Sequence, residues 1–191
     1  SRVLLPNYIA GEIEVEDLSF VEEQFLQDDQ ISFIHGVAIG IDSKNKKVKV
    51  KDHGDVVYDR LIIAAGASPP TNDYKNGHVD GIYNLRDFED AMSIKKKATI
   101  AQHCVVIGGG LISLKTAWAL NTLEKKVTMI VASSHLLSTT MDDQGAKILE
   151  KIFKLNGIEI LLNENVEEFS EYNGSVSGAK LNSGKEIKCQ L

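Results

Sequence analysis

Three consecutive glycines stand between an apolar run and a helical pattern within residues 105–123. In a strand–turn–helix with the pattern G-x-G-x-x-G, the first glycine permits the tight turn and the second lets the backbone approach a diphosphate. The third glycine lets the helix and strand pack closely, and the phosphates lie on unsatisfied N–H groups of the helix. Gly108 and Gly110 hold the first two places, and Ser113 holds the third. The pattern predicts a dinucleotide-binding turn with one altered position.

A second position decides which nucleotide such a turn selects. An acidic side chain about 20 residues after the turn accepts the ribose hydroxyls of NAD, whereas an arginine accommodates the 2′-phosphate of NADP. Val131 stands near the expected acidic position, and Ala132, Ser133 and Ser134 supply neither a carboxylate nor a guanidinium. His135 and the serines are either weak phosphate contacts or part of an ordinary polar turn.

Lys115 follows the turn by one helical turn. It is interpreted either as a positive charge beside the ligand or as a solvated surface lysine, and the second interpretation is slightly favoured.

The elements around the turn alternate between strands and helices. Residues 103–107 read as a buried strand, residues 126–131 and 158–162 as two further strands, and residues 111–123 and 142–157 as helices. The second helix is amphipathic, with Ile148, Ile152 and Leu155 on one side and Gly157 as its stop. Residues 165–191 then read as an antiparallel meander with turns at 173–174 and 183–184. Such alternation predicts a parallel sheet with helices.

The first part of the chain shows related signals. Residues 16–28 have helical spacing, and residues 31–59 read as three short antiparallel strands separated by turn clusters. Leu61–Ala65 is a continuous apolar run of the kind that suits a strand buried on both faces. A further helix is expected after Asn84 or Asp87, with lysines in its last turn.

The same unit therefore occurs twice, as parallel-sheet material with an inserted meander. We expect a Rossmann-like three-layer α/β dinucleotide-binding domain and a partial second domain of the same type. Residues 1–80 are assigned to a partial FAD-binding domain without its glycine turn, and residues 81–191 to an NAD(P)-binding domain without its final strand. The chain opens with Ser1 and is interpreted as an internal fragment.

Composition excludes several classes of protein. The formal charge of −6 argues against a nucleic-acid partner, because phosphate binding needs a basic surface. An apolar run long enough to span a membrane is absent from the sequence, so a membrane partner is not expected. Cys104 and Cys189 lack the spacing of a dithiol or zinc site, and they are expected to be buried reduced thiols of a cytoplasmic protein.

Four segments together resemble the pyridine nucleotide–disulfide oxidoreductase superfamily. They read "YDRLIIAAGASPP", "GIYNLRDFEDAMSI", "VVIGGGLISLKTAWAL" and "VTMIVASSHLLSTTMDDQGAKILEKIFKLNGIEILLNENVEEF". The opening "SRVLLPNYIAGE" places Val3 where peroxide- and coenzyme-A-disulfide-reducing members carry a redox cysteine, so a thiolate nucleophile is not expected. The chain is more similar to the rubredoxin-reductase and nitrite-reductase large-subunit branch.

The resemblance implies two cofactors and the residues that contact them. The NAD(P) residues are Gly108, Gly109, Gly110, Leu111 and Ile112, with Ser113 replacing a glycine and Val131 replacing an acidic residue. Lys115 stands in place of a glutamate. The FAD residues of the parent protein are Arg2, Ala38, Ala64, Ala65, Gly66 and Arg86, with Ala65 in place of the usual threonine. The fragment alone is not expected to retain FAD.

Two functions follow as hypotheses. The first is an FAD-dependent oxidoreductase that takes hydride from NAD(P)H and passes electrons to a protein or small-molecule acceptor. It needs no catalytic acid, base or metal from this segment, and the resemblance allows a homodimer. The second is a degenerate dinucleotide-binding or sensing module that does not oxidise NAD(P)H. The three departures from the family pattern favour the second hypothesis, and the retained glycines favour the first.

Overall fold

The computed structural model describes residues 1–19, 21, 25, 30–68 and 74–191. The chain divides into two compact units: Ser1–Phe20 together with Pro69–Leu191, and Val21–Ser68. These two units are defined by contacts within the chain. The predicted boundary between residues 80 and 81 was placed from cofactor motifs, and it stays a prediction.

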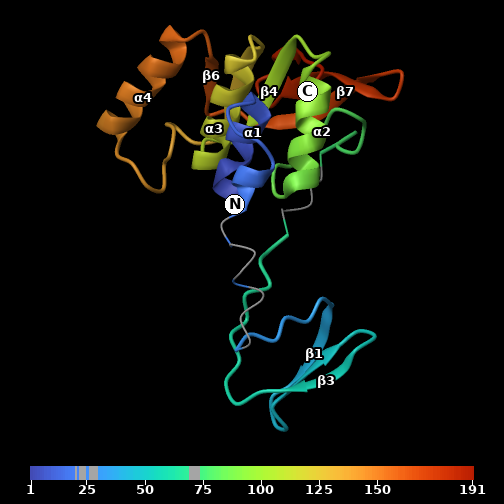
Figure 1. Ribbon diagram of the computed structural model, residues 1–191. Helices are drawn as coiled ribbons and strands as arrows, with labels where there is room; N and C mark the ends of the chain where they lie inside the picture. The colour runs from blue at the N-terminus through green and yellow to red at the C-terminus, as the bar shows by residue number, and fades with distance from the viewer. Residues whose placement is uncertain (20, 22–24, 26–29, 69–73) are drawn as a thin grey trace. The chain divides into compact units, whose positions relative to one another are not determined.

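A three-stranded parallel sheet forms the centre of the first unit (Figure 1). Its strands are β4 (His103–Ile107), β5 (Lys126–Val131) and β6 (Glu159–Leu162), in that order. Helix α3 (Leu111–Thr122) connects β4 to β5, and helix α4 (Asp143–Leu155) connects β5 to β6. The carboxyl ends of the three strands lie at one edge, where Ile107 pairs with Ile130, and Val131 with Leu162.

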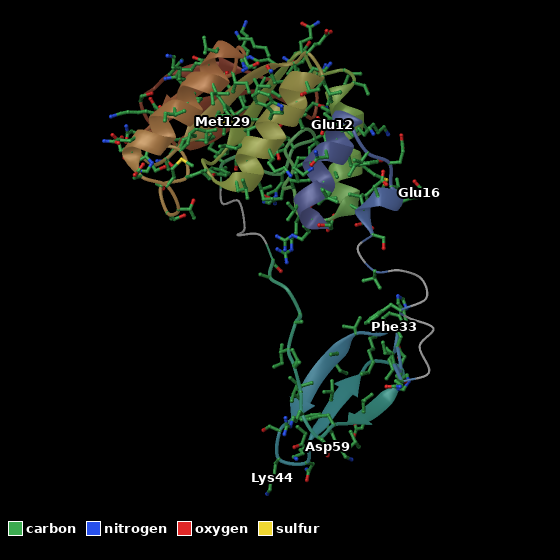
Figure 2. All side chains as sticks on the ribbon, turned by 60° about the vertical axis from the view of Figure 1, so that its left-hand side comes forward. Glu12, Glu16, Phe33, Lys44, Asp59 and Met129 are labelled. Carbon is green, nitrogen blue, oxygen red and sulfur yellow. The ribbon has the colours of Figure 1, made fainter. Side chains whose placement is uncertain are left out.

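Strand β5 shows how the sheet is buried on both faces. Successive side chains of a strand point to opposite faces. Val127, Met129 and Val131 belong to a core formed with the helices, whereas Ile130 belongs to a second core formed with the C-terminal meander. Met129 is fully buried, and Figure 2 marks its place within the first unit. The three-layer arrangement expected for the dinucleotide-binding domain is confirmed.

Three helical segments complete the helical layer. The 3₁₀ turn η1 (Arg2–Leu4) leads into α1 (Leu5–Ala10), which packs against both α3 and α2 (Phe88–Ala98), as Figure 1 shows. Helix α2 begins with a reciprocal cap in which the Asp87 side chain accepts from the Asp90 N–H and the Asp90 side chain accepts from the Asp87 N–H. The predicted helix start at Asp87 and the lysines of its last turn are therefore confirmed.

Helix α4 has an unexpected orientation. Its buried residues are Ala146, Glu150 and Phe153, and Phe153 packs against Trp118 of α3 with ring centroids 5.6 Å apart. Ile148, Ile152 and Leu155 share one face as predicted, but their side chains are 66%, 44% and 76% exposed. The apolar stripe of this helix therefore faces solvent within the described part of the chain.

The C-terminal meander covers the other face of the parallel sheet. Its strands are β7 (Val166–Tyr172), β8 (Ser175–Leu181) and β9 (Glu186–Lys188). Positive φ angles of 79° at Gly174 and 83° at Gly184 confirm the two predicted turns. After β9 the chain returns to the sheet, where the Val105 N–H donates to the Leu191 carbonyl at 2.7 Å.

The second unit holds an antiparallel sheet of β1 (Ala38–Asp42), β2 (Lys47–Val50) and β3 (Gly54–Val57), as the sequence predicted. The prediction of a buried strand at Leu61–Ala65 is wrong in this structure. That segment has no regular structure, and Ile62 is 89% exposed. An apolar run forms a strand buried on both faces only when neighbouring strands and covering layers exist, and the described residues of this unit provide neither.

The helix predicted over residues 16–28 is described only in part. Glu16–Leu18 forms the 3₁₀ turn η2, and residues 20, 22–24 and 26–29 lie outside the described residues. Among the helices that the structure describes, none combines the length and apolar character needed to cross a membrane.

Candidate functional site: a glycine turn at the carboxyl edge of the parallel sheet

The glycine turn leaves β4 in a conformation that needs its first glycine. Gly108 has a φ of 113°, in the region that side chains other than glycine rarely adopt. Its N–H donates to the Ile130 carbonyl at 2.8 Å, which ties the turn to β5. A Cβ atom at Gly108 would lie 2.8 Å from the Ser113 Oγ, so the serine hydroxyl would have to move to accommodate a side chain here.

The next two glycines have opposite surroundings. A Cβ atom at Gly109 would lie 2.6 Å from the Val131 Cγ1, so Gly109 is required by packing inside the protein. A Cβ atom at Gly110 would meet no protein atom within 4 Å, so Gly110 is not required by packing. Gly110 is the second glycine of the motif, and its exposed backbone borders the space where a diphosphate would approach.

Helix α3 begins directly after Gly110 without a side-chain cap. The N–H groups of a first helical turn have no partner inside the helix, and they carry the positive end of the helix dipole. Since the N-cap residue supplies no side-chain cap, these amides stay available for a ligand. The residues predicted for a nucleotide, Gly108 to Ser113, are thus brought together at the carboxyl edge of the sheet.

Ser113 fits the third position of the motif. Its Oγ lies 3.4 Å from the Ile107 carbonyl oxygen and directly beneath the Gly108 backbone. The extra atoms of the serine occupy the space that Gly108 leaves free. The altered third position therefore preserves the close approach of helix and strand.

The end of β5 presents no carboxylate, in agreement with the sequence. The Val131 side chain is 1% exposed and packs against Gly109, so it cannot reach a ribose. The Ser133 hydroxyl donates to the His135 carbonyl at 2.8 Å, and the His135 Nδ1 lies 2.9 Å from the Leu136 carbonyl oxygen. The polar groups of this loop are largely engaged with one another, which favours the interpretation as a polar turn.

Lys115 has a structural partner that neither interpretation of the sequence included. Its ammonium group donates to the Val3 carbonyl at 2.7 Å and thereby links α3 to η1. The residue is only half-exposed, and its charge is held against the backbone of the N-terminal segment.

Sequence reasoning missed Glu164, which follows the third parallel strand. Its N–H donates to the Val131 carbonyl at 3.1 Å, and the neighbouring Asn163 N–H donates to the Ser133 carbonyl at the same distance. Glu164 therefore lies beside the end of β5. The signal was available, because the carboxyl ends of all parallel strands border the same crevice.

The residues predicted to contact FAD fall in both units. Arg2 and Arg86 lie in the first unit, whereas Ala38 in β1 and the segment Ala64–Gly66 lie in the second. Gly66 has a φ of 74°, so a glycine suits this position. The FAD assignments stay predictions.

The cysteines carry no chemistry at this site. Cys104 and Cys189 are free and buried, as expected, and burial raises the pKa of each thiol to about 11. A thiolate nucleophile is therefore not provided by either residue near neutral pH. Within the described ranges, groups of three or more His, Cys, Asp or Glu side chains that would hold a metal ion are absent.

Known proteins match the whole chain. The chain is 29% identical over 185 residues to a rubredoxin-NAD(+) reductase of Ectopseudomonas oleovorans, an alignment that covers 96% of this chain and 48% of that protein. A ferredoxin reductase from Rhodopseudomonas palustris superposes with a TM-score of 0.93 at 22% identity, over 100% of this chain and 48% of that chain. A NAD-dependent persulfide reductase from A. fulgidus superposes with a TM-score of 0.89 at 28% identity, over 100% and 37%.

These likenesses confirm the predicted fold, and the chain spans about half the length of the curated relative it matches. The family model described as pyridine nucleotide-disulphide oxidoreductase matches residues 1–191. The glycine turn, the three-layer sheet and this match over the full sequence lead to one conclusion: the chain belongs to the pyridine nucleotide-disulphide oxidoreductase family.

Proposed function

We propose that this chain is part of an FAD-dependent oxidoreductase that binds NAD(P)H at the turn Gly108–Ser113. The observation that carries the proposal is the open space at Gly110, which lies beside the uncapped start of α3. Bare backbone and free amides at that place fit a diphosphate and serve no purpose in the protein's own packing.

Each part of the turn has a separate role in this proposal. Gly108 directs the chain away from β4, and Gly110 lets the diphosphate reach the backbone. Leu111, Ile112 and Ser113 contribute the amides of the first turn of α3. When bound, NAD(P)H would supply a hydride and FAD would accept it, so the protein's task is binding and orientation.

The electron acceptor is proposed from the relatives. One relative is named for rubredoxin and a structural neighbour for ferredoxin, so we infer a redox protein as the acceptor. The two buried free thiols support a reducing, cytoplasmic location. The FAD contacts of Arg2, Ala38, Ala64, Ala65, Gly66 and Arg86 and a homodimeric state remain predictions.

The test is an anaerobic titration of the purified parent-length protein, with FAD bound, with NADH and with NADPH. Loss of the visible flavin absorbance with either nucleotide supports the oxidoreductase. Bound flavin that neither nucleotide reduces refutes it and leaves the degenerate binding module as the better account. Chemical reduction of the same sample by dithionite is the control, since it shows that the flavin is redox-competent.

A further inference from the structure

A buried carboxylate oxygen lies beside the nucleotide site without a partner. The Oε2 atom of Glu164 is shielded from solvent and forms no hydrogen bond with the described residues. Buried polar atoms in folded proteins are nearly always hydrogen-bonded, because an unpaired buried acceptor loses its hydration without compensation. The donor for this oxygen therefore lies outside the described residues, in a water molecule or in a bound ligand.

The position of Glu164 is fixed by the backbone. Strand β6 ends at Leu162, and the Glu164 N–H donates to the carbonyl of Val131, the last residue of β5. Val131 is the position at which an acidic residue that binds ribose is expected. The backbone of Glu164 thus lies next to the end of β5, the place where an acidic residue is expected and absent.

The neighbouring groups do not offer an alternative. Val131 packs inwards against Gly109, and the Ser133 hydroxyl already donates to the His135 carbonyl. The buried Glu150 carboxylate accepts from the Leu136 N–H at 3.4 Å. Among the buried side-chain atoms that the structure describes at this end of β5, Glu164 Oε2 is the one without a hydrogen-bond partner.

We propose that Glu164 binds the adenosine ribose of NADH, with its carboxylate accepting hydrogen bonds from the ribose hydroxyls. The inference rests on the proposed function, and it adds a nucleotide preference. The 2′-phosphate of NADPH would bring negative charge against this carboxylate, and like charges at close range are strongly unfavourable in a partly buried site. The protein therefore selects NADH through a residue at the end of β6 instead of one at the end of β5.

The experiment compares Glu164→Gln with the wild-type protein and with Glu167→Gln. Glu167 is an exposed glutamate on β7, three residues further along, and it serves as the matched control. Dissociation constants are measured by calorimetry for NADH, for NADPH and for an NADH analogue that lacks the adenosine 2′-hydroxyl.

We expect Glu164→Gln to weaken NADH binding about 5- to 10-fold, since a charge-assisted hydrogen bond becomes a neutral one. NADPH binding should become tighter in the same variant, because the repulsion is removed. The dissociation constants of the wild-type protein and of Glu164→Gln should differ less for the 2′-deoxy analogue than for NADH. Glu167→Gln should leave all three constants unchanged.

A second measurement separates ligand binding from a structural role. Without nucleotide, Glu164→Gln should unfold at the same or a higher temperature than the wild-type protein, because a partly buried charge is replaced by a neutral amide. A lower melting temperature would assign Glu164 to structure and overturn the inference.

The remaining outcomes are also distinct. Equal effects of Glu164→Gln on NADH and NADPH, or a wild-type preference for NADPH, would overturn the role of Glu164 while leaving the proposed function intact. If the wild-type protein binds neither nucleotide, the proposed function itself fails.

Discussion

Replacing Gly110 by alanine should weaken nucleotide binding while leaving the stability of the protein nearly unchanged. The new Cβ would have no protein atom within 4 Å. Gly110 has a φ of −84° and a ψ of 173°, a conformation that alanine adopts without strain. Removing a glycine from the unfolded chain stabilises the protein by about 0.4–1 kcal/mol. Alanine caps a helix less well than glycine does, by roughly 0.5–1 kcal/mol. The two effects nearly cancel.

The same substitution acts strongly on a bound diphosphate. The methyl group would stand between the phosphate oxygens and the backbone at the start of α3. Loss of one hydrogen bond to a charged group amounts to about 1.5–3 kcal/mol, and each 1.4 kcal/mol is about tenfold in affinity. We therefore expect Gly110→Ala to weaken NAD(P)H binding by about 10- to 100-fold. The melting temperature should change by no more than about 2 °C.

Calorimetric titration with NADH and NADPH, together with thermal unfolding of the same samples, measures both quantities. Unchanged affinity in a folded Gly110→Ala protein would refute the placement of the diphosphate at this turn. A large loss of stability would show that the open space at Gly110 is filled by the protein itself, which would equally contradict the reasoning.

Three further predictions concern packing, pH and capping. Gly109→Ala should destabilise the protein by about 1–3 kcal/mol, because its Cβ would lie 2.6 Å from the Val131 Cγ1. Adding Val131→Ala should recover much of that loss, and denaturant unfolding of the two single variants and the double variant gives the coupling energy. Burial raises the pKa of the Cys104 and Cys189 thiols from 9.0 in the unfolded chain to about 11 in the folded protein. The stability that the neutral thiols contribute is therefore complete below the unfolded-state pKa, and it is lost as the pH rises through the folded-state pKa. Unfolding free energy should therefore fall between about pH 9 and 11, and a Cys104→Ser/Cys189→Ser protein with an unchanged slope in that window would contradict this. Asp87→Ala should remove the cap of α2 at a cost of about 1 kcal/mol, which thermal unfolding would register as a decrease of roughly 2–4 °C; an unchanged melting temperature would show that the cap contributes nothing.

Local signals predicted the nucleotide-binding half of the first unit well. The turn at Gly108, the helix after it and the strand at Lys126–Val131 all depend on neighbouring residues: a glycine for a positive φ, then an apolar helical pattern, then a continuous apolar run. Such signals act over a few residues, so one sequence is sufficient to find them.

Burial was predicted less well, because it depends on distant partners. Leu61–Ala65 has the composition of a buried strand, yet no strand of its unit pairs with it in the described structure. The apolar stripe of α4 at Ile148 and Ile152 was expected from the helical period, but the helix instead packs through Ala146 and Phe153.

The position of Glu164 could not be obtained from motif spacing. Its relation to Val131 results from parallel pairing between β5 and β6, which brings together residues more than thirty positions apart. The unpaired carboxylate oxygen is visible only when every neighbouring donor has been placed. The sequence at the end of β5 contains no acidic residue, whereas the folded protein has Glu164 from the end of β6 at the same edge of the sheet.

The docking of α1 has a consequence for synthesis of the protein on the ribosome. Leu5 is 4% exposed and Ile9 is completely buried, and their helix packs against α2 and α3, which begin at Phe88 and Leu111. The ribosome synthesises Leu5 and Ile9 long before it synthesises α2 and α3, the helices that cover them. Until residue 122 has left the exit tunnel, α1 lacks its partner helices and depends on delayed collapse or on chaperones for protection.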